Sequence, residues 1–220
     1  MTELAARFWI DAGEPPPFPR DLRAVAHWFP ELHVKEVPHL TAALAAEHFA
    51  RFNILCPDAR DDRPLRGCFG ASHGTALILI DPTDVEDEVR FTFAHELAHF
   101  LRDYQDVRRK AVAKFGPDIL AVLDGDRSAT PGERLAGALR GVTVGCHAHF
   151  LDRDRWGRVV TEAAFEAEEA ADRLAFELLA PFDAVNPDAC PPRAALHERL
   201  TSVFGLPPTL AIKYATILLD

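Results

Sequence analysis

The sequence predicts an α+β fold that is mostly helical, with a small mixed or antiparallel β-sheet. Apolar residues recur at helical spacing through most of the 220 residues. Segments with strand character are short, and all of them precede residue 83. Two of these segments flank a glycine-containing turn, which predicts a β-hairpin. The helical segments therefore dominate, and the sheet is confined to the first part of the chain.

The expected elements follow from apolar spacing and from the positions of proline and glycine. Before the hairpin, helices are expected over residues 4–12, 21–28 and 41–52, and a strand over 32–37. Residues 66–69 and 76–80 are the two hairpin strands. After the hairpin, helices are expected over residues 83–104, 107–115, 119–123, 134–139 and 161–179, and two more between residues 192 and 218. Thr83 followed by Glu86 predicts a capping box at the start of the helix over 83–104.

Composition and charge restrict the classes of function. Apolar residues make up 48% of the chain and charged residues 26%, which is ordinary for a globular protein. The formal net charge of −10 argues against direct nucleic-acid binding, because phosphate binding requires clustered Lys and Arg. No stretch reaches the roughly 18 apolar residues of a membrane span. The four cysteines are scattered, so no disulfide framework is expected, and a cytoplasmic location fits best.

The motif that carries chemistry is HExxH, at residues 95–99. On a helix, His95 and His99 lie one turn apart on the same face, so that two imidazoles can reach one tetrahedral Zn²⁺ ion. Glu96 can take a proton from the water that the metal activates and return it to a leaving amine. On a helical wheel the three residues fall outside the apolar arc, which predicts a helix that lines a cleft. The histidines could instead make polar contacts on an exposed face, so a third ligand is needed.

The third ligand is expected on the helix over residues 161–179. Glu168 and Asp172 lie inside the apolar arc of this helix, where carboxylates need a metal ion or a partner of opposite charge. Glu168 is the predicted ligand, and Asp172 is expected to accept a hydrogen bond from a ligating histidine. Glu169, at the edge of the arc, is the alternative ligand, and pairing of Glu168 with Arg173 or another basic residue is the alternative without a metal. Mixed His and Glu ligands suit Zn²⁺ and also Mn²⁺.

Two segments together resemble a known family. Residues 90–100 (RFTFAHELAHF) resemble the first signature of the ImmA/IrrE-type metallopeptidases, RFTLAHELGHY. Residues 168–181 (EEAADRLAFELLAP) resemble their second signature, E-x-E-A-N-x-F-A-x-x-L-L-M-P. This chain departs from the pattern at four positions, which are Ala98 for Gly, Asp172 for Asn, Leu174 for Phe and Ala180 for Met.

The resemblance implies a zincin-like catalytic domain over residues 1–182 and a packed C-terminal helical segment, helix-turn-helix-like, over 183–220. About fifty extra residues separate the two motifs, which places a helical insertion at about 105–157. The implied activity is that of a zinc endopeptidase that cleaves a transcriptional repressor of the helix-turn-helix type, in a stress response or a mobile element.

Further residues are assigned by position. His73, between the hairpin strands, and Tyr104 are candidates for steadying the oxyanion of the reaction intermediate. The strand residues Ala76, Leu77, Ile78 and Leu79 are expected to form the edge that aligns an extended substrate. The sequence Cys146-His147-Ala148-His149 has no evident partner set for a metal, and core or loop residues are expected there.

Two alternative functions follow from the same scaffold. The first is a catalytically silent, zinc-containing module that sequesters a partner protein, and a fourth protein ligand from His147 or His149 would favour it. The second is a metal hydrolase of small substrates, with the insertion closing a narrow pocket. The intact Glu96 favours catalysis, because a structural zinc site has no use for that residue.

Overall fold

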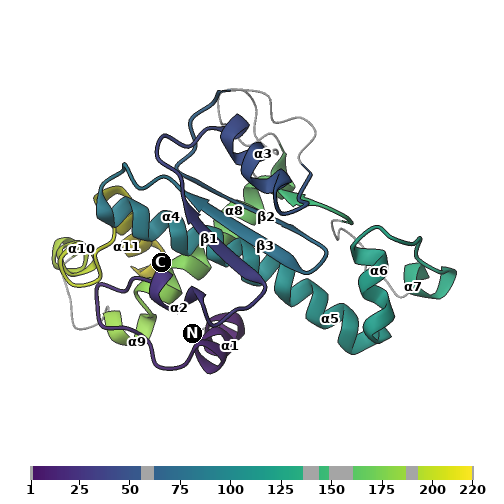
Figure 1. Ribbon diagram of the computed structural model, residues 1–220. Coiled ribbons are helices and arrows are strands. Elements are labelled where there is room, and N and C mark those ends of the chain that lie inside the picture. Colours follow the sequence, from purple (N-terminus) through teal and green to yellow (C-terminus); the bar gives the residue numbers. More distant parts are fainter. Residues whose placement is uncertain (1, 56–61, 136–143, 149–160, 187–192, 220) are drawn as a thin grey trace.

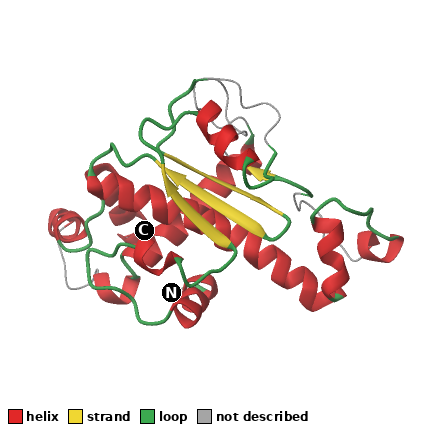
Figure 2. Ribbon diagram, viewed as in Figure 1, coloured by secondary structure: helices red, strands yellow, loops and turns green. Residues whose placement is uncertain are grey.

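The computed structural model describes residues 2–55, 62–135, 144–148, 161–186 and 193–219. Its centre is a four-stranded sheet in the order β1-β3-β2-β4, surrounded by helices (Figures 1 and 2). The strands are β1 (Leu32–Glu36), β2 (Gly67–Ser72), β3 (Thr75–Ile80) and β4 (His147–Ala148). β1 is parallel to β3, whereas β2 is antiparallel to β3 and to β4. The predicted α+β class, the hairpin and the mixed sheet are confirmed, whereas β4, which lies after residue 83, was not predicted.

Helices cover both faces of the sheet, which explains why β3 is apolar at consecutive positions. Ala76, Ile78 and Ile80 belong to the main core, which includes α4 (Glu86–His99) and α8 (Glu162–Leu179). Leu77 and Leu79 point to the opposite face and pack with Phe49 of α3 (Ala42–Ala50). The alternation of side chains thus divides β3 between two cores.

The helix that carries HExxH begins later than the sequence predicts. α4 starts at Glu86, and its N-cap residue Val85 makes no side-chain capping bond. Thr83 instead donates its hydroxyl to Asp81, so the capping-box prediction was wrong. The helix then continues through a π-helical stretch, η1 (Phe100–Gln105), into α5 (Asp106–Phe115).

The part of the insertion that is described extends away from the sheet along α5 (Figure 1). It continues through η2 (Pro117–Ile119), α6 (Leu120–Leu123) and α7 (Pro131–Leu135). A small separate core holds this arm together, made of Ala111, Ile119, Val122 and Leu123. Most of the helix expected over 134–139 and the last part of the insertion lie outside the described residues.

Helices from both ends of the chain pack around α4 and α8. They are α1 (Glu3–Ala12), α2 (Arg23–Ala26), α9 (Phe182–Val185), α10 (Arg193–Ser202) and α11 (Pro208–Leu219). The two helices predicted between residues 192 and 218 are confirmed, whereas α9 is a short helix that the sequence analysis did not predict. No helix in the described part of the chain is both long enough and apolar enough to cross a membrane.

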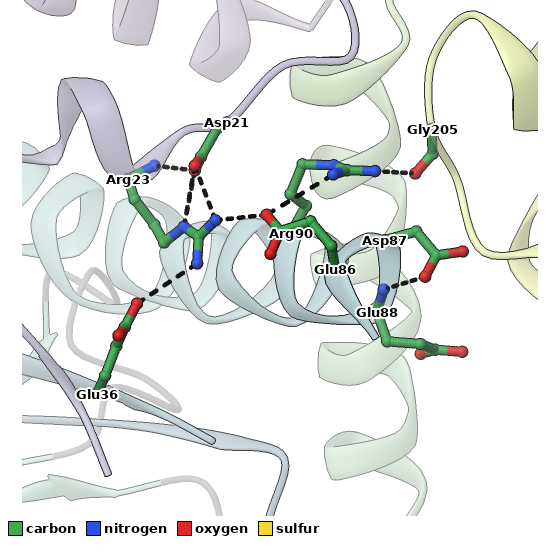
Figure 3. A network of polar contacts seen from close by, with 8 residues as sticks. All are labelled: Asp21, Arg23, Glu36, Glu86, Asp87, Glu88, Arg90 and Gly205. Atoms are coloured by element: carbon green, nitrogen blue, oxygen red, sulfur yellow. Dashed lines mark hydrogen bonds and ion pairs between the residues drawn. The ribbon is translucent and has the colours of Figure 1, made fainter. Parts of the chain in front are cut away.

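A polar network holds the start of α4 between the two ends of the chain (Figure 3). Arg23 pairs with Asp21, with Glu36 of β1 and with Glu86 of α4, at 2.8, 3.5 and 2.6 Å. Arg90 of α4 donates to the carbonyl of Gly205, between α10 and α11, at 3.2 Å. Gly205 has a φ of 65°, and a Cβ there would lie 2.6 Å from Arg90 Nη2 and 2.7 Å from Pro19 Cβ, so a larger residue would be strained. This network fixes the orientation of α4 relative to the C-terminal helices.

Candidate metal centre

The centre forms where α4 packs against α8. His95 and His99 project from α4 one turn apart, and Glu168 reaches them from the first half of α8. One potential ligand atom from each of the three residues lies within 4.8 Å of the other two. The two Nε2 atoms are 3.2 Å apart, and the carboxylate oxygens of Glu168 lie 3.4 Å from His95 Nε2 and 3.7 Å from His99 Nε2. These three residues therefore make a group that could hold a metal ion.

A carboxylate holds the other nitrogen of each imidazole ring. His95 Nδ1 lies 2.7 Å from Asp172 of α8, as the sequence predicts. His99 Nδ1 lies 2.7 Å from Asp103, one helical turn further along. Since a carboxylate only accepts hydrogen bonds, each Nδ1 is the donor, and in a neutral ring each Nε2 then presents a lone pair.

The chemistry of His95, His99 and Glu168 shows whether these residues suit a metal ion. In the neutral rings two Nε2 lone pairs and a carboxylate point to one place, and acceptors so arranged repel one another unless a proton or a metal ion lies between them. His and carboxylate ligands, with the second ring nitrogen bound to a carboxylate, are the usual arrangement of metal-binding histidines. The donor set therefore fits a divalent metal ion.

The protonation of His95 reflects the same arrangement. Burial opposes a charge on the ring, but the hydrogen bonds to Asp172 and Glu168 outweigh burial and raise the pKa of His95 to about 10. A proton and a metal ion compete for the same lone pair, because a ligating imidazole must be unprotonated on that nitrogen. The carboxylates thus provide strong attraction for either cation.

Glu168 is the carboxylate that meets the histidines, and Glu169 points elsewhere. Glu169 forms an ion pair with Lys213 of α11, at 2.5 Å. Lys213 also contacts Asp172, at 2.7 Å. The choice of Glu168 made from the helical wheel thus agrees with the geometry, because the face of α8 that carries Glu168 and Asp172 is the face that packs on α4.

A cavity of about 380 Å³ opens at this centre. Glu96 lines it together with the three potential ligands, and Phe91, Leu65 and Leu210 contribute apolar wall. His99 and Glu96 are only 1% and 9% exposed, so the polar face of α4 lies inside the molecule, under α8 and β2. Cys68 of β2 also lines the cavity, but burial and the nearby charge of Glu96 raise the pKa of its thiol well above the ordinary range.

His73 and Tyr104 do not lie at this cavity. In the described part of the chain, His73 in the hairpin turn contacts Ser72 at 2.8 Å and Asp126 of the insertion at 3.1 Å. The Tyr104 hydroxyl accepts a hydrogen bond from the amide of Gly74, at 2.7 Å. The structure therefore does not bring these two predicted oxyanion residues to the centre, because Tyr104 of η1 faces the hairpin turn instead.

β3 is not an edge strand. From Ala76 to Ile80 every residue pairs with β1 on one side and with β2 on the other, so no backbone edge is left for a substrate. The assignment of Ala76, Leu77, Ile78 and Leu79 as the substrate-aligning strand was therefore wrong. β2 is the strand that reaches the cavity, since Gly67 and Cys68 line it. Gly67 permits this approach, because a Cβ there would lie 2.6 Å from Thr92 of α4.

His147 is a core residue, as expected. It is 7% exposed in β4, where its ring packs near Phe69 and Tyr104. Cys68 is a free thiol, whereas Cys56, Cys190 and His149 lie outside the residues the structure describes.

The sequence analysis missed two residues of the centre. Asp103 could have been found from its spacing, because it follows His99 by four residues on the same helix. Lys213 could not, since 41 residues separate it from Asp172 and only the packing of α11 on α8 brings the two together.

Comparisons with known proteins do not add to this geometry. No protein-family model, no curated protein and no solved structure matches the chain.

Proposed function

We propose that this protein is a zinc-dependent endopeptidase. His95, His99 and Glu168 would hold Zn²⁺, with Mn²⁺ as the alternative ion, and Glu96 would serve as the general base. The observation that carries the proposal is the convergence of three ligand groups beside a buried carboxylate, all lining one cavity. A site that bound a metal for structure alone would have no need of either Glu96 or an accessible cavity.

The residues around the centre have distinct tasks in this proposal. Zn²⁺ held by such ligands supplies Lewis acidity, which lowers the pKa of water and polarises a peptide carbonyl. Glu96 accepts a proton from the attacking water and passes it to the leaving amine nitrogen. Asp172 and Asp103 keep the Nδ1 proton on each histidine and so direct each Nε2 to the centre.

An extended substrate would align along β2 instead of β3. Within the described residues, β4 pairs with Gly70 and Ala71 of β2. Gly67 and Cys68 are also the β2 residues that line the cavity. A peptide in the cavity would therefore lie beside this part of β2 and next to Glu96.

The substrate that we propose is a transcriptional repressor of the helix-turn-helix type, in the cytoplasm. Support for this comes from the two sequence segments that resemble the ImmA/IrrE-type metallopeptidases. The alternative, a silent zinc-containing module that sequesters a partner, would be favoured by a fourth protein ligand. Among the described residues, His147 is not part of the group whose ligand atoms converge.

Metal analysis of the purified protein tests the centre. We expect one equivalent of zinc in the wild type and in Glu169→Ala, and loss of zinc in Glu168→Ala. Zinc absent from the wild type, or retained in Glu168→Ala, would contradict the assignment.

Hydrolysis is tested separately, with a proteome-derived peptide library and mass spectrometry. We expect new peptide termini with the wild type and none with Glu96→Gln. Zinc binding without any cleavage would move the sequestering module to first place.

A further inference from the structure

Asp172 is held at both of its carboxylate oxygens. Oδ1 accepts the hydrogen bond from His95 Nδ1 at 2.7 Å, and Oδ2 accepts one from the ammonium of Lys213, also at 2.7 Å. The carboxylate cannot rotate without losing one of the two bonds. The Asp172 side chain is 16% exposed and that of Lys213 is 33% exposed, so solvent screens this contact less than a surface ion pair.

Lys213 reaches Asp172 because α11 is fixed on α8 by neighbouring contacts. The ring of Tyr214 stacks on Phe176 of α8, with centroids 4.5 Å apart and planes 6° from parallel. The Tyr214 hydroxyl donates to the carbonyl of Ala180, at 3.0 Å. Leu210, about one helical turn before Lys213, lines the metal cavity itself. One face of α11 thus forms part of the cavity wall and of the support behind it.

The second histidine has a matching support, but a local one. Arg102 contacts Asp103 Oδ1 at 2.7 Å, while Asp103 Oδ2 accepts from His99 Nδ1. These three residues lie within five positions of one helical segment, and Arg102 also donates to the carbonyl of Ala167 on α8. On both sides of the centre, a basic side chain therefore contacts a carboxylate, which in turn contacts a histidine. On the His95 side the cation comes from the C-terminal segment.

We propose that Lys213 is a positioning residue that orients Asp172 against His95 and thereby raises the affinity of the centre for its divalent metal ion. This inference rests on the proposed metal centre. It makes α11 a component of that centre, so that metal binding and the docking of the C-terminal helices favour each other.

Removal of Lys213 changes metal affinity in opposite directions, depending on whether Lys213 acts by positioning Asp172 or by charge repulsion. Lys213 carries a positive charge close to a site for a cation, so its removal would tighten metal binding if charge repulsion alone were at work. Loss of positioning has the opposite effect, because His95 is then less well held. Weaker binding after removal of Lys213 therefore excludes charge repulsion as the main effect, and the control variants separate positioning from docking of α11.

The test is the Zn²⁺ affinity of the full chain, measured by competition with a chromophoric chelator. We expect Lys213→Met to bind Zn²⁺ about tenfold more weakly than the wild type, as for other residues that support metal ligands. Lys213→Arg keeps the charge and the hydrogen-bonding groups, so it should recover most of the affinity. The visible spectrum of the Co²⁺-loaded protein should also change in Lys213→Met, because the ligand geometry changes.

Two control variants isolate the contact with Asp172. Glu169→Gln breaks the other ion pair of Lys213, and Arg199→Met removes the hydrogen bonds that Arg199 donates to Val185 and Ala184 elsewhere in the C-terminal segment. Both should lower the melting temperature and leave Zn²⁺ affinity unchanged. Circular dichroism confirms that each variant is folded.

The outcomes distinguish this inference from the proposed function. If the wild type binds no Zn²⁺, the metal centre itself is wrong. If the wild type binds Zn²⁺ and Lys213→Met binds it equally or more tightly, the role of Lys213 is wrong while the centre stands. If Arg199→Met weakens binding as much as Lys213→Met does, Lys213 acts only by docking α11, and the positioning role is overturned.

Discussion

Two polar clusters lie along the continuous helix of α4 and η1, and they differ in how their groups are paired. Around His95 and His99, three acceptors converge on one place. Around Tyr104, the Gly74 amide meets the tyrosine hydroxyl, and His73 meets Ser72 and Asp126. Acceptors gathered together need a cation from outside, whereas donors matched with acceptors need nothing further. The first cluster is therefore suited to binding a metal ion, and the second stabilises the hairpin turn.

The largest effect is expected from the general base. Glu96→Gln should lower peptide hydrolysis by about 10³-fold, because the amide cannot accept the proton of the attacking water. Zinc content should stay at the wild-type level, since Glu96 is not a ligand in this proposal. Both quantities are measured on the same preparation, by mass spectrometry of the peptide library and by metal analysis. Glu166→Gln, which changes an exposed carboxylate of α8, serves as the matched control. A Glu96→Gln protein as active as the wild type would remove Glu96 from the mechanism.

The carboxylates behind the histidines come next. Asp172→Asn and Asp103→Asn should each weaken Zn²⁺ binding by about 10- to 100-fold, because an amide no longer fixes the Nδ1 proton and the ring orientation. Chelator competition measures the affinity. Asp126→Asn is the control from the other cluster, since Asp126 contacts His73 and no effect on zinc is expected. Equal losses in all three variants would mean that the two clusters do not differ as described.

Tyr104 should affect stability and not metal binding. In Tyr104→Phe the amide of Gly74 loses its acceptor, which should lower the free energy of unfolding by about 1 kcal/mol. Denaturant titration of the metal-free protein measures this, and Zn²⁺ affinity should remain that of the wild type. A loss of hydrolytic activity in a stable Tyr104→Phe protein would restore Tyr104 as a candidate for the reaction.

The smallest effect is expected at His73. Its contact with Asp126 joins two side chains that are 56% and 58% exposed, and pairs of this kind contribute little. His73→Ala should change the free energy of unfolding by less than about 0.5 kcal/mol and leave zinc binding unaltered. Reduced Zn²⁺ affinity in this variant would show that the hairpin turn influences the centre.

The sequence predicted those parts of the centre that depend on spacing along one helix. His95 and His99 share a face of α4 because the helical repeat places residues four apart on one side. Glu168 and Asp172 were found by the same rule, since both lie in the apolar arc of α8. Asp103 obeys this rule as well, because it follows His99 by four residues on the same helical segment.

The misassigned residues depend on contacts between elements. β3 is strongly apolar because helices cover both faces of the sheet, and the same pattern would suit an edge or a central strand. Only the parallel pairing with β1 makes it central. Tyr104 follows HExxH closely in sequence, but η1 directs its hydroxyl toward the amide of Gly74.

The sequence by itself determined the fold class, the shared face of His95 and His99 with Glu96 beside them, and the carboxylate face of α8, because each follows from the periodicity of a single element. The tertiary structure decided that β2 borders the cavity and that His73 and Tyr104 lie away from it. It also decided that Lys213 of α11 donates a hydrogen bond to Asp172. Packing between elements far apart in the chain is set by the shape and burial of whole surfaces, and no local spacing encodes it.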